Sequence, residues 1–353
     1  NVFSRTVLLI WIILSLTGCA GFNPPPIQTL AVSGPMDGPL LQPGQKITVM
    51  SFNVQYMAGK NYVFFYDMLD GSGKDSRPSP KDITATFGEV ARVIRETDPD
   101  IILLQEMDEG AKRTDYEDQL ERLLRILPSD YRFHTSAFYW KSNFVPHPKI
   151  MGETGMKLST ISKYRITNAK RYQLALREVG ALEQKFQIKR ALLETRIGMQ
   201  NGNEFSVMNT HLAAFAQGED TMQRQVKFIK DLLDKYTAAN IPFIIGGDFN
   251  LLPNTEAYMA LNEYEQEYYQ KNSELDVLTK DYPSIPTQDE MTGPKKEKWF
   301  THFANNPKFK GPDRTIDYVF YSRMLKPGDH FVMQDNTLHI SDHLPLVMDF
   351  EMP

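Results

Sequence analysis

The feature that most constrains the fold of this chain is a pattern of strand, helix and strand that occurs twice. In the first copy, residues 47–54 (ITVMSFNV) form a β-rich strand, and residues 101–106 (IILLQE) form a short apolar strand that ends in Glu106. Between them, Asp82 can cap a helix. The apolar residues that share one face of this helix are Ile83, Phe87, Val90 and Ile94. The first copy therefore predicts an α/β unit with two buried strands.

The second copy lies later in the chain and repeats the same order. Residues 204–212 (EFSVMNTHL) form its first strand, and residues 241–245 (IPFII) form its second. The apolar face of the intervening helix consists of Met222, Val226, Ile229 and Leu233. Polar residues stand near the strand ends of both copies, namely Asn53, Glu106, Asn209 and His211. Because α/β sheets hold their sites at the carboxyl ends of strands, we expect these side chains to meet.

Residues 246–250 (GGDFN) follow the last of these strands and present Asp248 and Asn250 with one residue between them. Side chains two residues apart in an extended strand point to the same face, so the carboxylate and the amide would point together into a site. The alternative is a simple turn, since Gly, Asp and Asn are also turn residues. The polar ends of the other strands favour the site.

Two further strand ends lie near the carboxyl terminus. Residues 314–322 (RTIDYVFYS) alternate as a strand around Asp317, and residues 340–352 (ISDHLPLVMDFEM) place Asp342 and His343 just before a final strand. An oxygen-rich set of this kind suits Mg²⁺, Mn²⁺ or Ca²⁺. The single cysteine and the lack of a His-x-x-x-His spacing argue against a standard zinc site.

Length and charge set broader limits. The chain has 353 residues, for which about two domains of roughly 150 residues would be the first expectation. Its formal net charge is −5 and it contains no basic block, which weakens the case for nonspecific binding of nucleic acid.

The first residues resemble a bacterial lipoprotein signal. An apolar run over residues 7–14, too short to span a bilayer, leads into the string LTGC, which ends at Cys19. The resemblance implies a signal peptide over residues 1–18 and a lipid on Cys19, with the protein anchored in the bacterial cell envelope, in the outer membrane. The alternatives are an uncleaved membrane anchor and a buried helix. Residues 19–45 are rich in Pro and Gly and are expected to form a tether.

Six short motifs follow one another within residues 51–346. They are SFNV, LLQE, NTHL, GGDFN, IDYVF and SDHLP. None is specific by itself, but the ordered set resembles the endonuclease/exonuclease/phosphatase superfamily, which includes deoxyribonucleases, sphingomyelinases and inositol phosphatases. The resemblance implies one domain over residues 46–353. Its expected fold is an α/β (α+β), four-layer sandwich of two packed mixed β-sheets flanked by helices, with the two units as pseudo-two-fold halves.

The resemblance also implies roles for the residues at the strand ends. A divalent metal, in the first place Mg²⁺, would be held by Glu106, with Asn53 and Asp342 as further ligands. Asp248 would activate or orient the attacking water, with Asn250 beside it as a donor. The resemblance thus implies metal-assisted cleavage of a phosphoester.

Histidines complete the implied site. His343, oriented by Asp317, would donate to phosphate oxygens or protonate the leaving group, and His211 would be a second imidazole facing the phosphate. His302 is a further candidate because it lies just before the Asp317 strand. The remaining histidines are expected to be ordinary surface or loop residues: His134, His147, His330 and His339.

Some of these residues have plainer explanations. Asn53 and Asn250 can bond loop backbone, and Asp317 can be a buried acid that supports a histidine. Gln55 stands where the apurinic endonucleases of the superfamily carry an aspartate. Because glutamine lacks the charge, a tightly bound second metal and an abasic-site substrate are less favoured.

Two aromatic stretches are candidates for substrate contact. Residues 61–67 (NYVFFYD) and 138–149 (FYWKSNFVPHPK) can be core, or they can form a rim that stacks bases or touches lipid. Lys141 and Lys149 in the second stretch suit a ligand that carries phosphate.

An exported enzyme of this kind is expected to be a monomeric phosphodiesterase or phosphatase that acts on phospholipid-like or nucleotide substrates. A nuclease is the next hypothesis, with nucleic acid possible as a partner but not favoured. A third is a non-catalytic surface binding protein that keeps the fold. The set of Glu106, His211, Asp248 and His343 speaks against this third hypothesis.

Overall fold

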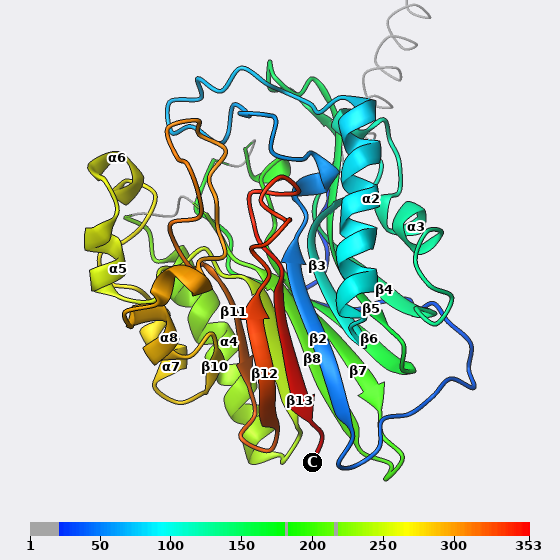
Figure 1. Cartoon of the computed structure of the whole chain (residues 1–353). Coiled ribbons are helices and arrows are strands. Elements are labelled where there is room, and N and C mark those ends of the chain that lie inside the picture. The colour runs from blue at the N-terminus through cyan, green and yellow to red at the C-terminus, as the bar shows by residue number, and fades with distance from the viewer. Residues whose placement is uncertain (1–20, 181–182, 215–217) are drawn as a thin grey trace, which may run out of the picture.

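Two β-sheets packed face to face form the centre of the protein, and helices cover their outer faces (Figure 1). The computed structural model describes residues 21–180, 183–214 and 218–353. The predicted signal peptide and Cys19 lie outside these residues. The four-layer sandwich of two mixed sheets expected from the sequence is confirmed.

Within the part of the chain that the structure describes, thirteen strands build the two sheets. One sheet contains β2 (Lys46–Asn53), β3 (Ile101–Asp108), β4 (Phe133–Val145), β5 (Gly152–Ser162), β12 (Lys326–Val332) and β13 (Leu346–Glu351). The other contains β1 (Ile27–Thr29), β6 (Ile166–Gln173), β7 (Ala191–Gly198), β8 (Glu204–His211), β9 (Phe243–Asp248), β10 (Ser284–Ile285) and β11 (Asp317–Tyr321).

The strands of the two sheets follow corresponding orders, as the repeated strand–helix–strand pattern in the sequence suggests. The first runs β12-β13-β2-β3-β5-β4, and the second runs β6-β7-β8-β9-β11-β10, with β1 added beside β6. Each contains one parallel pair, β2 with β3 and β8 with β9, and the other named pairs are antiparallel. The corresponding orders give the pseudo-two-fold halves.

A long helix joins the two strands of each parallel pair and covers the outer face of its sheet. These helices are α2 (Pro80–Thr97) and α4 (Thr221–Ala238), which lie on opposite sides of the sandwich in Figure 1. All eight apolar residues predicted to face the core from these two helices are buried. The N-cap of α2 is Ser79 rather than Asp82, because the Ser79 side chain accepts a hydrogen bond from the Asp82 backbone and Pro80 opens the helix.

Five shorter helices complete the described fold. They are α3 (Gln119–Leu124), α5 (Thr255–Ala260), α6 (Glu263–Gln266), α7 (Asp276–Thr279) and α8 (Gln288–Thr292). Single 3₁₀ turns occur at Gln55–Met57, Lys112–Thr114, Glu183–Lys185 and Lys296–Trp299.

The core between the sheets is apolar and is crossed by the buried hydrogen bonds of Asn209. Val49 and Leu103 from one sheet belong to the same buried cluster as Val207 from the other. The amide of Asn209 accepts from Gln105 at 2.8 Å and donates to the Leu104 carbonyl at 3.0 Å. Asn209 therefore ties the sheets together and does not belong to the strand-end site.

Residues 21–45 pack along the domain, whereas the sequence suggested a tether. β1 pairs with β6, and Leu41 is completely buried in the core between the sheets. The reason is that an edge strand such as β6 has backbone groups without hydrogen-bond partners on its free side. A few residues of even a Pro-rich segment can pair with these groups.

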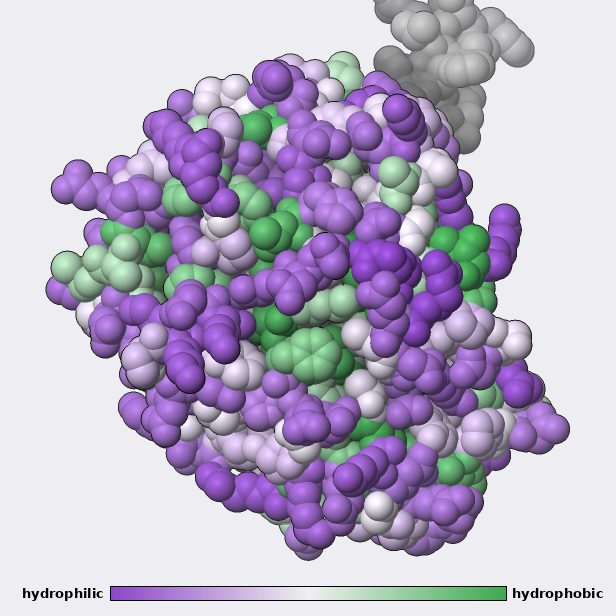
Figure 2. All heavy atoms as spheres, viewed as in Figure 1, coloured by the Kyte–Doolittle hydropathy of each residue, from purple (hydrophilic) through white to green (hydrophobic). Residues whose placement is uncertain are grey.

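None of the helices within the described residues combines the length and the apolar character needed to cross a bilayer. The face shown in Figure 2 is mostly hydrophilic, with apolar residues in small groups.

Candidate active site

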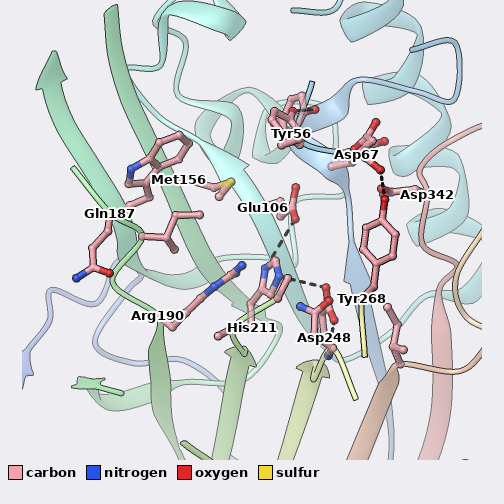
Figure 3. Close-up of a pocket in the computed structure, with 18 of the residues that line it drawn as sticks. Tyr56, Asp67, Glu106, Met156, Gln187, Arg190, His211, Asp248, Tyr268 and Asp342 are labelled. Carbon is pink, nitrogen blue, oxygen red and sulfur yellow. Dashed lines mark hydrogen bonds and ion pairs between the residues drawn. The ribbon is translucent and has the colours of Figure 1, made fainter. Parts of the chain in front are cut away.

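A cavity of about 510 Å³ opens where β3, β8 and β9 carry polar side chains to one edge of the sandwich. Figure 3 shows Glu106, His211 and Asp248 facing one another inside it. The residues suggested by the sequence that line the cavity are Glu106, His211, Asp248, Asn250, His302, Asp342 and His343. Asn53 and Asp317 do not line it, but each is hydrogen-bonded to a residue that does.

Asp248 is held by an amide from the opposite sheet. It is only 2% exposed, and Asn53 Nδ2 donates to its Oδ2 at 3.1 Å and to Glu106 Oε1 at 3.2 Å. The other end of the same amide, Asn53 Oδ1, accepts from the Gln55 backbone at 3.1 Å. Asn53 therefore orders the loop backbone and also links the two carboxylates.

Asn250 lies beyond the end of β9, so its side chain does not follow the strand alternation expected from the sequence. Its φ is +51°, its backbone N–H donates to Asp248 Oδ1 at 2.9 Å, and its Nδ2 donates to the Leu212 carbonyl at 3.2 Å. GGDFN is thus a strand end followed directly by a turn. Asn250 lines the cavity while its amide fixes the loop after β8.

Gly247 allows β8 and β9 to approach closely beside the site. Its φ is +143°, and a β-carbon at this position would lie 1.9 Å from the Thr210 carbonyl oxygen. No other residue fits this backbone, which carries Asp248 into the cavity.

Glu106 reaches the cavity through an irregularity in β3. The strand continues past it to Asp108, but the pairing with β5 shifts register between Leu104 and Met107, and Glu106 has a φ of +60°. A bulge of this kind re-aims a side chain at the cost of local strain. Burial and then the nearby Asp342 carboxylate raise the pKa of Glu106.

His343 is oriented by Asp317. Its Nδ1 lies 2.8 Å from Asp317 Oδ2, and its Nε2 lies 3.5 Å from Asp248 Oδ2. Burial alone would lower the pKa of His343, but Asp317 and Asp248 together raise it well above its ordinary value. The two carboxylates therefore favour the charged form of the His343 imidazole.

His211 has the opposite character. Burial, followed by the charges of Arg190 and His343, holds the pKa of His211 well below its ordinary value. Its Nε2 is 3.2 Å from Asp248 Oδ2 and its Nδ1 is 3.3 Å from the Tyr139 hydroxyl. A neutral ring fits these contacts if Nε2–H donates to the carboxylate and Nδ1 accepts from Tyr139.

The two possible substrate contacts fall in different places. His302 lines the cavity with its ring 5.0 Å from that of His343, and its buried Nδ1 has no hydrogen-bond partner among the described residues. Lys141 is exposed and does not line the cavity. Its ammonium instead lies over Phe138, 4.1 Å from the ring centroid.

Several residues of the cavity gave no clear signal in the sequence. Asp67 is bonded to Asn305 Nδ2 at 3.0 Å, and burial and then Asp342 raise the pKa of Asp67 to about 7. His147, expected to be an ordinary surface residue, is exposed but also lines the cavity, stacked on Phe65. In the sequence, the only indication that Asp67 belongs to the cavity was its position at the end of the aromatic stretch 61–67.

The donor set fits a divalent cation. Asp342 is close enough to Glu106 for its charge to raise the pKa of Glu106, and the buried Gln55 Oε1 in the same cavity lacks a partner among the described residues. Two triplets have ligand atoms within 4.8 Å of one another, namely His302–Asp342–His343 and Asp248–Asp317–His343. Both contain His343, which already bonds Asp317 through Nδ1. The carboxylates Glu106 and Asp342 offer the oxygen ligands that suit Mg²⁺ better.

Comparison with known proteins gives the fold and the family. The Endonuclease/Exonuclease/phosphatase family profile matches residues 50–343. An endonuclease/exonuclease/phosphatase from Beutenbergia cavernae DSM 12333 has a TM-score of 0.58 at 19% identity, covering 87% of this chain and 72% of that chain. The human Nocturnin catalytic domain with bound sulfate anion has a TM-score of 0.54 at 18% identity, covering 92% and 97%.

TDP2 from C. elegans has a TM-score of 0.50 at 17% identity, covering 88% of this chain and 76% of that chain. No curated protein matches the chain. Structural similarity at such low identity shows a shared fold. The family profile matches most of the sequence and therefore shows the family. This protein therefore belongs to the endonuclease/exonuclease/phosphatase family, whose members are generally hydrolases of phosphoester bonds.

Proposed function

We propose that this protein is a divalent-metal-dependent phosphodiesterase or phosphatase, with Mg²⁺ as the most suitable metal. The observation that carries the proposal is the arrangement around Asp248. One buried carboxylate lies 3.1 Å from the amide of Asn53, 3.2 Å from His211 and 3.5 Å from His343. A general base, a neutral imidazole and a charged imidazole thus converge in one cavity beside a pair of carboxylates.

Each of these groups has a task in phosphoester hydrolysis. Asp248 accepts a proton from the attacking water, and burial, the largest influence on it, raises its pKa toward a range suited to a base. His343 donates its proton to the leaving group, and Asp317 keeps that imidazole charged and aligned. His211 donates to a phosphoryl oxygen when substrate displaces its contact with Asp248. A cation held by Glu106 and Asp342 would neutralise charge on the phosphoryl oxygens.

The walls of the cavity support an organic phosphoester as substrate. Apolar side chains line one side, among them Trp140, Met156 and Ile188. Such a wall can receive the acyl or base portion of a phospholipid-like or nucleotide substrate. The lipoprotein-like residues 1–19 support a lipid anchor in the outer membrane of the cell envelope. A nuclease is the second candidate function.

The test compares hydrolysis of bis-p-nitrophenyl phosphate and p-nitrophenyl phosphate by a protein that begins at residue 21. Each substrate is assayed with Mg²⁺, Mn²⁺, Ca²⁺ or EDTA. The Asp248→Asn variant should lose activity by about 10²- to 10⁴-fold, as expected for removal of a general base. Asp231→Asn, which changes an exposed helix carboxylate, is the matched control. Metal-independent turnover, or full activity in Asp248→Asn, would contradict the proposal.

A further inference from the structure

Arg190 is a buried cation in the wall of the cavity, and it forms no ion pair with any residue that the structure describes. It directly precedes β7, is 9% exposed and lines the cavity. Its Nη1 is buried without a hydrogen-bond partner, and within residues 21–180, 183–214 and 218–353 no carboxylate pairs with its guanidinium. The guanidinium lies over the Tyr139 ring, whose centroid is 5.4 Å from Arg190 Cζ.

The other arginines of the cavity are all neutralised. Arg113 pairs with Asp108 at 2.8 Å, and Arg177 pairs with Glu219 at 2.7 Å. Arg314 pairs with Glu265 at 2.6 Å and with Asp313 at 2.7 Å. A buried guanidinium without an anion is unfavourable, because the lost hydration is not replaced. Arg190 therefore differs from the other arginines of the cavity, because no described residue accepts a hydrogen bond from its Nη1.

The backbone of Arg190 is fixed, so the side chain is presented in a defined direction. Its carbonyl accepts from the Leu174 N–H at 3.1 Å and from Gln173 Nε2 at 3.0 Å. In Figure 3 the guanidinium points into the cavity beside the His211 ring, while Asp67 and Asp342 lie on the opposite side. The cavity thus has an acidic end suited to a cation and a basic end suited to an anion.

A single phosphoryl group at the acidic end has partners without Arg190. His343 and Asn250 line the cavity together with the carboxylates that suit a metal, whereas Arg190 lies beside His211 on the side away from Asp67 and Asp342. A volume of about 510 Å³ holds more than one phosphoryl group and leaves Arg190 to meet a different part of the ligand.

We propose that Arg190 binds an oxyanion of the substrate other than the phosphoryl group that is hydrolysed, so that the substrate carries at least two anionic groups, as in a bisphosphate or diphosphate. A guanidinium presents a planar fork of donors that matches a phosphate or carboxylate. The proposal rests on the proposed hydrolase function only in treating the bound anion as part of a substrate.

Calorimetry with the full chain in detergent and Mg²⁺ tests this subsite without turnover. The probes are methylphosphonate, with one phosphonate, and the α,ω-diphosphonates of methane, propane and pentane, which span increasing distances. At least one diphosphonate should bind at least about tenfold more tightly than methylphosphonate. In Arg190→Met this advantage should fall below about threefold, because the second anion loses its partner. These carbon-linked probes are not hydrolysed, so the result is independent of whether any phosphoester is cleaved.

Arg177→Met is the matched control, since Arg177 lines the same cavity but is already paired with Glu219. It should keep the preference for the diphosphonate. Arg190→Lys retains the charge without the planar fork and should keep part of the preference, which provides a second variant if Arg190→Met does not fold. The proposal is overturned if the wild type shows no diphosphonate preference or if Arg190→Met keeps it. It is equally overturned if methylphosphonate binding weakens as much as diphosphonate binding, because Arg190 would then contact the hydrolysed group itself.

Discussion

Asn53, on the central strand of one sheet, donates a hydrogen bond of 3.1 Å to Asp248 at the end of a strand in the other sheet. The same Nδ2 lies 3.2 Å from Glu106, so one amide joins the expected base to the expected metal ligand. The two residues are separated by 195 positions in the chain. The site therefore exists only when the two halves of the sandwich are packed against each other.

Replacing Asn53 with Ala should lower kcat/KM for bis-p-nitrophenyl phosphate by about 10- to 100-fold. A hydrogen bond to a charged group contributes about 1.5–3 kcal/mol, and two carboxylates would lose theirs. Asn201→Ala in an exposed turn serves as the control. Activity within about twofold of wild type for Asn53→Ala would show that the amide does not position Asp248.

Asp317→Asn should move the alkaline limb of the pH–rate profile to lower pH. Burial lowers the pKa of His343, and Asp317 is the largest influence that raises it. If protonated His343 donates to the leaving group, activity is present below its pKa and is lost as the pH rises through it. Removing the Asp317 charge lowers that pKa, so activity should disappear at a lower pH than in wild type. An unchanged alkaline limb would mean that His343 is not the acid.

Removal of divalent metal by EDTA should abolish hydrolysis and lower the melting temperature. A ligand present at 100 times its dissociation constant stabilises the native state by about 2.7 kcal/mol. Glu106→Gln should lose the metal-dependent rise in melting temperature, because the amide cannot supply the charge that holds the cation. Glu256→Gln, at an exposed helix position, should retain it. An equal rise in both variants would place the cation elsewhere.

Gly247→Ala should destabilise the protein by more than about 3 kcal/mol in urea unfolding, because the new β-carbon would overlap the Thr210 carbonyl oxygen. Gly202→Ala separates this clash from backbone strain. Gly202 also has positive φ, at +81°, but a β-carbon there would meet nothing within 4 Å. Its cost should be about 1–2 kcal/mol. Equal losses in the two variants would rule out the clash as the cause.

Leu41→Ala should cost about 2–5 kcal/mol of unfolding free energy, the usual range for a buried leucine. Leu41 is completely buried, whereas Met36 in the same segment is 92% exposed. Met36→Ala should therefore change stability by no more than about 0.5 kcal/mol. If Leu41→Ala is equally silent in chemical denaturation, residues 21–45 are a tether after all.

Periodicity in the sequence was sufficient for the two strand–helix–strand units, whereas the layers of the fold were expected from the family resemblance. The helix faces that include Phe87 and Ile229 are buried as predicted, and the two strand–helix–strand units became the parallel pairs of the two sheets. This succeeded because burial of one helix face is a local property, readable from residues three and four apart. The six ordered motifs likewise led to the family that the profile match confirms.

Local sequence patterns did not predict the geometry at positions where a residue distant in the chain determines it. The bulge that turns Glu106 depends on its pairing with β5, and the turn at Asn250 depends on the Leu212 carbonyl. Residues 21–45 have the composition of a linker, yet the free edge of β6 recruits β1.

The amino-acid sequence was enough to predict the two strand–helix–strand units, the buried faces of their helices, and the polar residues at several strand ends. The packed structure was needed to show that Asn53 reaches Asp248, that Asp67 joins the acidic end of the cavity, and that Arg190 has no ion-pair partner among the described residues. The physical reason is that amphipathic periodicity reports how each segment meets its surroundings as a whole. Contacts between individual side chains depend on the relative position of the two packed sheets, which no single segment specifies.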